Sequence, residues 1–227
     1  MGEPYFQVKE KIDRHGVEVF SSNYALYADI SRRVMETLES ITPAIEIYSI
    51  DEAFIDLTGM EANFDLVAFG QMIRNTVFKH TGISVGVGIA KTKTLAKLAN
   101  NAAKTYPKTG GVVVLTEQHR IDKLMAITPV GEVWGVGRRI AQQLESMGIN
   151  TIADFVAHDT GSIRKRFSVV LERTQRELKG IPCFSLDDTP ATKQQIVCSR
   201  SFGERITQFE HLDQAVSGYI VRACEKL

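Results

Sequence analysis

The stretch Tyr48-Ser49-Ile50-Asp51-Glu52-Ala53-Phe54-Ile55-Asp56-Leu57 carries two adjacent carboxylates in the middle of an otherwise apolar, strand-like segment. Neighbouring residues on a regular strand point to opposite faces, so Asp51 and Glu52 can serve one site only where the chain turns. We therefore expect a β-hairpin with the acidic pair in its turn. Its arms would be residues 45–47 and 53–57.

Carboxylate oxygens in such a turn suit a hard divalent cation. Mg²⁺ usually takes one or two protein carboxylates together with substrate phosphates and waters. In nucleotidyl transfer, two metals ~3.5–4 Å apart clamp the attacking and leaving oxygens. The pair therefore suggests this chemistry first, with Asp51 and Glu52 as catalytic residues and metal ligands. The plainer alternative is a solvated hairpin turn, where acidic residues are common.

A second informative segment follows between Gly82 and Lys108. Up to Ile89, β-branched residues alternate with serine and glycine, as on a strand with one nearly bare face that another part of the molecule can approach closely. An Ala-rich helix comes next, and residues 91–108 contain five lysines and no acidic residue. Such a helix suits a substrate with several negative charges, such as a polyphosphate. The alternative is a solvated helix face that happens to be basic.

These segments carry a family resemblance. Tyr48–Phe54 and Gly86–Asn100 resemble the two central palm motifs of the Y-family translesion DNA polymerases. Residues 20–24, 133–139 and 198–205 are similar to the UmuC branch of that family. The resemblance extends over essentially the whole chain.

The resemblance implies an error-prone DNA-directed DNA polymerase of the SOS response and DNA repair, with Mg²⁺ as cofactor. It implies that Asp51 and Glu52 are the second and third catalytic carboxylates and that Lys104 contacts the incoming triphosphate. It also implies that Arg200 follows the template backbone, although Arg200 could instead lie on a solvated strand. The implied partners are primer–template DNA, dNTP, the cleaved UmuD dimer, the RecA filament and the sliding clamp.

The resemblance further implies an α+β fold whose palm packs helices on one face of a ferredoxin-like, mostly antiparallel sheet. The family's first catalytic aspartate lies in an Asp-x-x-x-Phe-Tyr-Ala-type motif, which this sequence lacks. We therefore expect a central fragment without the first palm strand, most of the fingers and most of the little finger. The expected parts are a fingers remnant (1–21), the palm (22–115), a helical thumb (116–183), a linker (184–192) and the start of the little finger (193–227).

Within the expected thumb, residues 133–139 look like the turn of a helix-hairpin-helix. Gly135 and Gly137 allow a tight turn before a helix that begins near Arg138. The backbone N–H groups at such a helix start can hold a DNA phosphate without reading bases. A plain αα-hairpin turn is the alternative, because Gly-x-Gly alone is a weak motif.

Two amphipathic helices are expected on either side of the hairpin. The first would be capped by Ser22 or Asn23 and run to the break at Thr42-Pro43. Its Tyr27 is expected in the core, with a contact near the nascent base pair as the alternative. The second would occupy residues 66–82.

Composition narrows the class of protein without identifying it. Lys and Arg total 27, as do Asp and Glu, so net charge gives no general sign of a nucleic-acid binder. The three cysteines and five histidines form no metal-ligand pattern. No apolar stretch reaches membrane-spanning length, and we expect a cytoplasmic location. The competing hypothesis is a non-catalytic DNA-binding or structural fragment that uses the helix-hairpin-helix.

Overall fold

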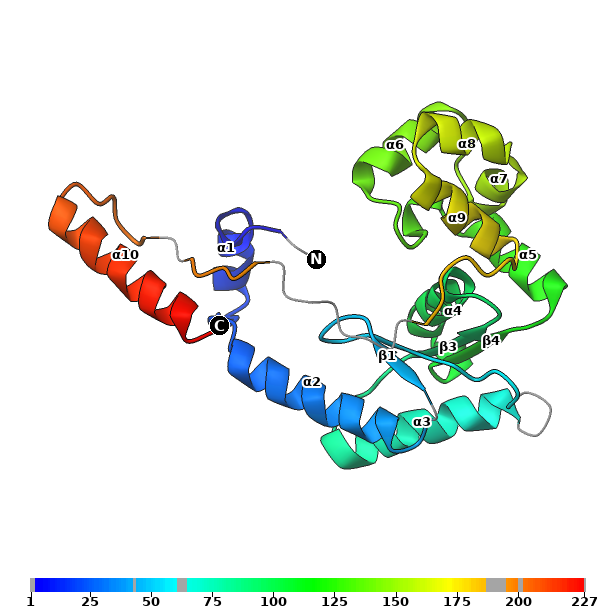
Figure 1. Ribbon diagram of the computed structural model, residues 1–227, viewed down its shortest axis with the longest axis horizontal. Helices are drawn as coiled ribbons and strands as arrows, with labels where there is room; N and C mark the ends of the chain where they lie inside the picture. Colours follow the sequence, from blue (N-terminus) through cyan, green and yellow to red (C-terminus); the bar gives the residue numbers. More distant parts are fainter. Residues whose placement is uncertain (1–2, 43, 61–64, 187–194, 200–201, 227) are drawn as a thin grey trace. The chain divides into compact units, whose positions relative to one another are not determined.

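The computed structural model describes residues 3–42, 44–60, 65–186, 195–199 and 202–226 (Figure 1). The chain divides into two compact units, Met1–Asp188 and Thr189–Leu227. The second unit contains α10 (Phe209–Cys224), which has no buried residue. The first unit contains, in order, α1 (Tyr5–Arg14), α2 (Tyr24–Glu39), β1 (Ile45–Ile47), β2 (Ala53–Ile55), α3 (Leu66–Thr81), β3 (Val87–Ala90), α4 (Lys93–Thr105), η1 (Pro107–Thr109), β4 (Val112–Leu115), α5 (Gln118–Ile127), η2 (Val130–Glu132), α6 (Arg138–Ser146), α7 (Ile152–Ala157), α8 (Thr160–Arg166) and α9 (Val169–Leu178).

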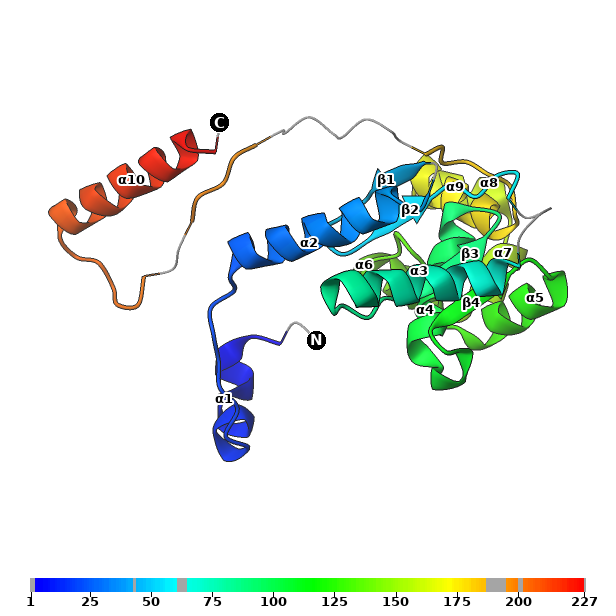
Figure 2. The same cartoon turned by 90° about the horizontal axis from the view of Figure 1, so that it is seen from below.

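The hairpin predicted from the acidic stretch is confirmed. β1 and β2 pair antiparallel, with Ile45 opposite Ile55 and Ile47 opposite Ala53. α2 packs against β1 and α3, as both views show (Figures 1 and 2). The buried side chains of this layer come from the last turns of α2 and from one stripe of α3: Met35, Leu38, Phe69, Ile73 and Val77.

Both flanking helices begin or end where the sequence predicts. The side chain of Asn23 caps α2 by accepting the backbone N–H of Leu26 at 3.1 Å. Gly82 ends α3 in the left-handed region, at φ +73°, where a residue without a Cβ is favoured.

The expectation that Tyr27 lies in the core is wrong, because its side chain is 58% exposed. Tyr24 is 80% exposed. Only the C-terminal half of α2 faces the hairpin and α3, so the apolar stripe of its first half remains on the surface. Helical periodicity identified the stripe but not how far the neighbouring elements extend along it.

β3, α4 and β4 form a β–α–β unit in which the strands pair parallel, with Val87 opposite Val112. The single, mostly antiparallel sheet expected from the resemblance is not what the described residues form: they contain two separate two-stranded sheets, β1–β2 and β3–β4. A parallel pair needs a crossover connection, and α4 supplies it. The mixed α+β content of the first unit nevertheless agrees with the expected class.

The nearly bare strand face predicted around Gly88 is confirmed, and the part that approaches it is α4. A Cβ on Gly88 would lie 2.2 Å from the backbone nitrogen of Asn100 and 2.4 Å from the carbonyl oxygen of Ala96. Only glycine leaves room for the helix backbone at this distance. The strand itself is shorter than predicted, because it begins at Val87 rather than Ile83.

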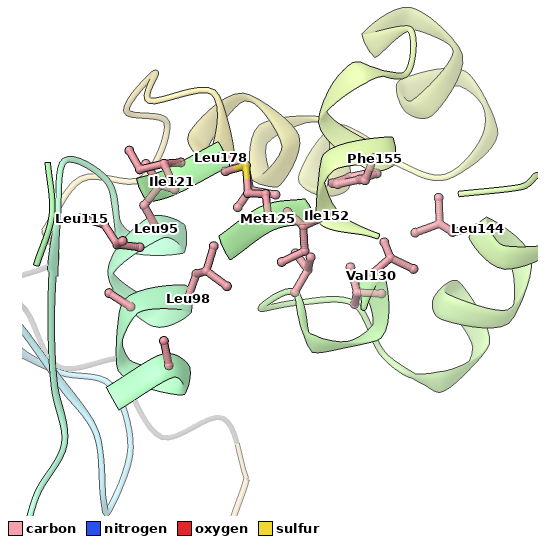
Figure 3. Close-up of a cluster of buried hydrophobic side chains, with 14 of the residues drawn as sticks. Leu95, Leu98, Leu115, Ile121, Met125, Val130, Leu144, Ile152, Phe155 and Leu178 are labelled. Carbon is pink, nitrogen blue, oxygen red and sulfur yellow. The ribbon is translucent and has the colours of Figure 1, made fainter. Parts of the chain in front are cut away.

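α4 also joins the β–α–β unit to the helices that follow. Its buried face contributes to one continuous hydrophobic core with α5, α6, α7 and α9 (Figure 3). Burying one leucine-sized side chain contributes roughly 1.5–3 kcal/mol, so this core fixes α4 against the helical region. The labelled members are Leu95, Leu98, Leu115, Ile121, Met125, Val130, Leu144, Ile152, Phe155 and Leu178.

Candidate functional site

The β1–β2 hairpin holds the acidic pair in a short turn. The backbone N–H groups of Tyr48 and Ser49 both donate to the carbonyl oxygen of Glu52 at 3.0 Å. The hydroxyl of Ser49 donates to Oδ1 of Asp51 at 2.7 Å, and the backbone N–H of Asp51 donates back to that hydroxyl at 3.3 Å. The turn therefore orients the Asp51 carboxylate while leaving it exposed.

Two lysines of α4 pair with two acidic residues of the hairpin. Nζ of Lys97 lies 2.5 Å from Oε1 of Glu52, and the two side chains are 22% and 30% exposed. Nζ of Lys93 lies 2.5 Å from Oε2 of Glu46, and these side chains are 11% and 14% exposed. Partial shielding from water strengthens both attractions. The sequence predicted a basic helix, but it did not indicate which lysines meet the hairpin.

Lys104 occupies the last turn of the same helix. It is seven residues beyond Lys97, which is about 10 Å along the helix axis on the same side of the helix. Its aliphatic stem lies beside Gly86, since a Cβ there would be 3.2 Å from Cγ of Lys104. The ion pair of Glu52 is therefore made by Lys97, and the role of Lys104 at a triphosphate stays a prediction.

An aromatic cluster joins the hairpin to the helical region. The ring of Trp134 lies 5.4 Å from that of Tyr48, 5.5 Å from that of Phe54 and 5.8 Å from that of Phe184, measured between centroids. The indole N–H donates to the hydroxyl of Tyr48 at 3.2 Å. Such pairs contribute about 0.5–1.5 kcal/mol each beyond area burial. The cluster ties Tyr48, beside the acidic turn, to the loop that precedes α6.

The lysines of α4 also contact this cluster. Nζ of Lys93 lies 5.0 Å from the centroid of the Phe54 ring, and Nζ of Lys97 lies 5.8 Å from that of Tyr48. Both distances fall within the range of cation–π attraction. Each ammonium is therefore held between a carboxylate and an aromatic face.

Glu177 on α9 is a structural residue of the site that the sequence did not reveal. Its side chain is fully buried, and Oε2 accepts the backbone N–H and the hydroxyl of Thr94 at 2.9 and 3.0 Å. Its backbone carbonyl accepts the hydroxyl of Thr92 at 2.9 Å. A carboxylate at the first turn of a helix suits the positive end of the helix dipole. Glu177 thus fixes the start of the lysine helix.

The glycine pair predicted for a DNA-binding turn lies just before α6. Gly135 adopts φ +87°, in the left-handed region, within a turn closed by the Val136 N–H and the Val133 carbonyl at 2.9 Å. Gly137 has an ordinary φ of −76° and precedes Arg138, the first residue of α6; no side chain caps this helix start. The backbone N–H groups of the first turn of α6 have no acceptor within the helix, and Gly137 at the cap position offers no side-chain acceptor. Arg200, predicted to contact the template, lies outside the described residues.

Asp56 follows the hairpin and differs from the acidic pair in its partners. The hydroxyl and the backbone N–H of Thr58 donate to Oδ1 of Asp56 at 2.6 and 2.8 Å. These hydrogen bonds, from the hydroxyl first and then the N–H, lower the pKa of Asp56 below its usual value. Asp56 therefore lies outside the turn and accepts its hydrogen bonds from the neighbouring residue Thr58.

The carboxylates of the turn are the kind of ligand that a hard divalent cation takes beside phosphates and waters. Asp51 offers an exposed carboxylate, and Glu52 offers a second one that a lysine now neutralises. Among the described residues, no group of three or more His, Cys, Asp or Glu side chains is arranged to hold a metal ion. Two carboxylates match the small number of protein ligands that such cations use beside phosphates and waters.

The helices that the structure describes include none that is long and apolar enough to cross a membrane. α10, at 16 residues, and α3, also at 16, are the longest together with α2.

Residues 1–101 match the family model described as the impB/mucB/samB family. The chain is 58% identical over 227 residues to Protein UmuC of Salmonella typhimurium, covering all of this chain and 54% of that protein. It is 55% identical over 227 residues to Protein MucB of Escherichia coli, with the same coverage of each. The chain thus spans about half the length of the curated relatives it matches.

Among solved structures, the chain is similar to a Y-family DNA polymerase chimera of Dbh and Dpo4. The TM-score is 0.67 at 22% sequence identity, over 81% of this chain and 53% of that one. At this identity the likeness concerns the fold alone.

Proposed function

We propose that the chain belongs to the impB/mucB/samB family and that it provides part of the active site of an error-prone translesion DNA polymerase of the Y family. The single observation that carries the proposal is the acidic turn held against the lysine helix, with Glu52 paired to Lys97. Carboxylates beside ammonium groups suit a substrate that is a metal-bound polyphosphate.

In this proposal Asp51 and Glu52 are the catalytic carboxylates that would hold Mg²⁺. When bound, the metal supplies charge neutralisation at the phosphates and activation of the attacking hydroxyl. The hydrogen bond from Ser49 orients Asp51, and the ammonium of Lys97 holds Glu52 close to the helix. Lys104 binds the triphosphate of the dNTP farther along the same helix.

The DNA contact of the proposal lies at the start of α6. The backbone N–H groups after Gly135 and Gly137, together with Arg138, would hold a phosphate of the primer–template. Arg200 is proposed to follow the template strand. These contacts are made to the DNA backbone and do not depend on the base sequence. Such contacts suit a polymerase that copies damaged templates.

The proposed division keeps the boundaries expected from the resemblance: palm 22–115, helical thumb 116–183, linker 184–192, with 1–21 and 193–227 belonging to the fingers and the little finger. The SOS response, mutagenesis and DNA repair follow as the proposed setting, in the cytoplasm. The cleaved UmuD dimer, the RecA filament and the sliding clamp are the proposed protein partners of the whole polymerase.

Primer extension tests the proposal. The 227-residue chain is incubated with primer–template, dNTPs and Mg²⁺, and Asp51→Asn is compared with Asp56→Asn. If the unmodified chain extends the primer, Asp51→Asn should abolish extension, because it removes one carboxylate charge from the turn. Asp56→Asn should retain it, because Asp56 is bound by Thr58. Equal extension by both variants would contradict the assignment.

A second candidate is a non-catalytic DNA-binding fragment. The observation in its favour is that the turn offers two carboxylates, with no third acidic, histidine or cysteine ligand grouped with them among the described residues. It predicts DNA binding without extension, unchanged by Asp51→Asn and weakened by Arg138→Ala.

A further inference from the structure

Glu177 is a buried carboxylate with two separate sets of partners. Its Oε2 holds the start of α4 through Thr94. Its Oε1 accepts the backbone N–H groups of Cys183 and Phe184 at 2.8 and 3.1 Å. Four donors therefore meet one side chain with no exposed surface. Burying a carboxylate is costly unless its oxygens accept hydrogen bonds, as they do here.

We propose that Glu177 is a positioning residue of the acidic hairpin, which acts through α4 and through the 183–185 segment. The inference deepens the proposed function and rests on it for the role of the hairpin. The side-chain hydrogen bonds of Glu177 go to Thr94, Cys183 and Phe184, and not to Asp51 or Glu52. Glu177 fixes the positions of the first turn of α4 and of residues 183–185, the two segments through which it acts on the hairpin.

One arm of this arrangement runs through α4. Thr94 lies between Lys93 and Lys97, so the carboxylate that fixes the backbone at Thr94 also fixes the level at which both lysines leave the helix. Lys97 then meets Glu52, and Lys93 meets Glu46. A shift of the first turn would move both ammonium groups relative to the hairpin.

The other arm runs through the segment after α9. With its N–H held by Glu177, Phe184 packs against Trp134. The carbonyl oxygen of the next residue, Ser185, accepts Nζ of Lys93 at 2.7 Å. Lys93 therefore joins the two arms, since it belongs to α4 and also binds the 183–185 segment. The aromatic cluster and the lysine pairs depend on the same buried carboxylate.

Glutamine in place of Glu177 would separate the two arms. A carboxylate accepts hydrogen bonds at both oxygens, whereas an amide accepts at one end and donates at the other. The Cys183 and Phe184 N–H groups can only donate, and so can the Thr94 N–H. Whichever way the amide is turned, at least one buried N–H is left facing an N–H group.

The test uses Glu177→Gln in the 227-residue chain and the emission of Trp134, the chain's one tryptophan. The matched control is Gln175→Met, on the same helix and equally buried, whose amide donates to the carbonyls of Phe155 and His158 and not to α4. Both variants are measured where far-UV circular dichroism shows full helix content. We expect a red shift and stronger acrylamide quenching of Trp134 in Glu177→Gln alone.

A merely structural role predicts equal loss of thermal stability in both variants with no change in Trp134 emission, and that result would overturn the proposal. If Glu177→Gln fails to fold, Thr94→Val and Thr94→Ser replace it. Valine removes the hydroxyl that donates to Glu177 and serine keeps it. The same red shift, smaller, is expected for valine only, and identical emission from the two would equally overturn the proposal.

A parallel Mn²⁺ titration by proton relaxation separates this inference from the proposed function. A Trp134 shift in Glu177→Gln, with no Mn²⁺ binding by the unmodified chain, would keep the positioning role and overturn the function of the hairpin. Mn²⁺ binding by the unmodified chain with unchanged Trp134 emission in Glu177→Gln would overturn the positioning role alone.

Discussion

The acidic turn and the Glu177 site use the same chemical group in opposite ways. At Glu177 the carboxylate is fully buried and four N–H and O–H donors satisfy it. At the turn, Asp51 is exposed with a hydroxyl as its partner, and Glu52 pairs with a single ammonium group, that of Lys97. Neutral donors fixed in the backbone lock a carboxylate in place, whereas a cation at the surface can exchange for another cation.

The difference shows where stability and chemistry are located in this chain. Removing a buried acceptor leaves its donors without water or protein partners, which is costly. Removing a surface carboxylate costs little, because water replaces it. We therefore expect the Glu177 site to dominate stability and the acidic turn to dominate ligand binding.

Glu177→Ala should have the largest effect on the stability of the chain. It removes an acceptor of four hydrogen bonds and leaves a cavity, so we expect a loss of about 3–5 kcal/mol in the free energy of unfolding. Urea denaturation followed by far-UV circular dichroism measures it. Asp51→Asn serves as the control, with an expected change within about 0.5 kcal/mol. A similar loss for both would show that burial does not distinguish the two carboxylate sites.

Gly88→Ala tests the close approach of α4 to β3 on which the lysine positions depend. The added Cβ would meet helix backbone at 2.2 Å, so strand and helix must separate, at a cost of about 1–3 kcal/mol. Thermal unfolding of Gly131→Ala is the comparison, because the nearest atom to its new Cβ lies at 3.5 Å. If the two variants unfold at the same temperature, the packing of α4 on β3 described above is incorrect.

Lys93→Met probes the shielded ion pair between α4 and the hairpin. It leaves Glu46 and the Ser185 carbonyl without the ammonium, and we expect a loss of about 1–2 kcal/mol by urea denaturation. The exposed pair of Lys9 and Asp13 provides the contrast: Lys9→Met should leave the free energy of unfolding nearly unchanged, because water replaces the ion pair. Equal costs would mean that shielding adds nothing at Lys93.

The smallest expected effect concerns acid stability. Hydrogen bonds lower the pKa of the Asp154 carboxyl below its usual value. The backbone N–H of Thr151 has the largest effect, and the Thr151 side chain and the Asn150 N–H add to it. A lowered pKa in the folded state stabilises the fold above the unfolded pKa, and this contribution is lost as the pH falls through the lowered value. Asp154→Asn should therefore reduce the fall in melting temperature between about pH 5 and about pH 3. An unchanged fall would contradict this assignment.

The sequence predicted the parts of the site that depend on local pattern. The hairpin follows from the alternation of apolar residues on either side of Asp51 and Glu52. Asn23 predicts the start of α2, Gly82 the end of α3, and the glycines before Arg138 the start of α6. Each of these signals lies within a few residues of the feature it sets. Capping and turn chemistry act at that range.

The contacts that the sequence did not predict join residues far apart in the chain. Trp134 and Tyr48 are separated by 86 residues, and Glu177 and Thr94 by 83. No periodicity within a helix or strand encodes such a pair, because it depends on how the elements pack. The same reason explains why a lysine-rich run was recognised while Lys97, the partner of Glu52, was not.

The proposed function requires that the acidic turn binds a divalent cation. A Mn²⁺ titration followed by water proton relaxation, on the unmodified chain, Asp51→Asn and Asp56→Asn, measures this binding. We expect saturable binding to the unmodified chain, binding weakened at least about tenfold, which is about 1.4 kcal/mol, in Asp51→Asn, and unchanged binding in Asp56→Asn. Equal binding by all three proteins would contradict it.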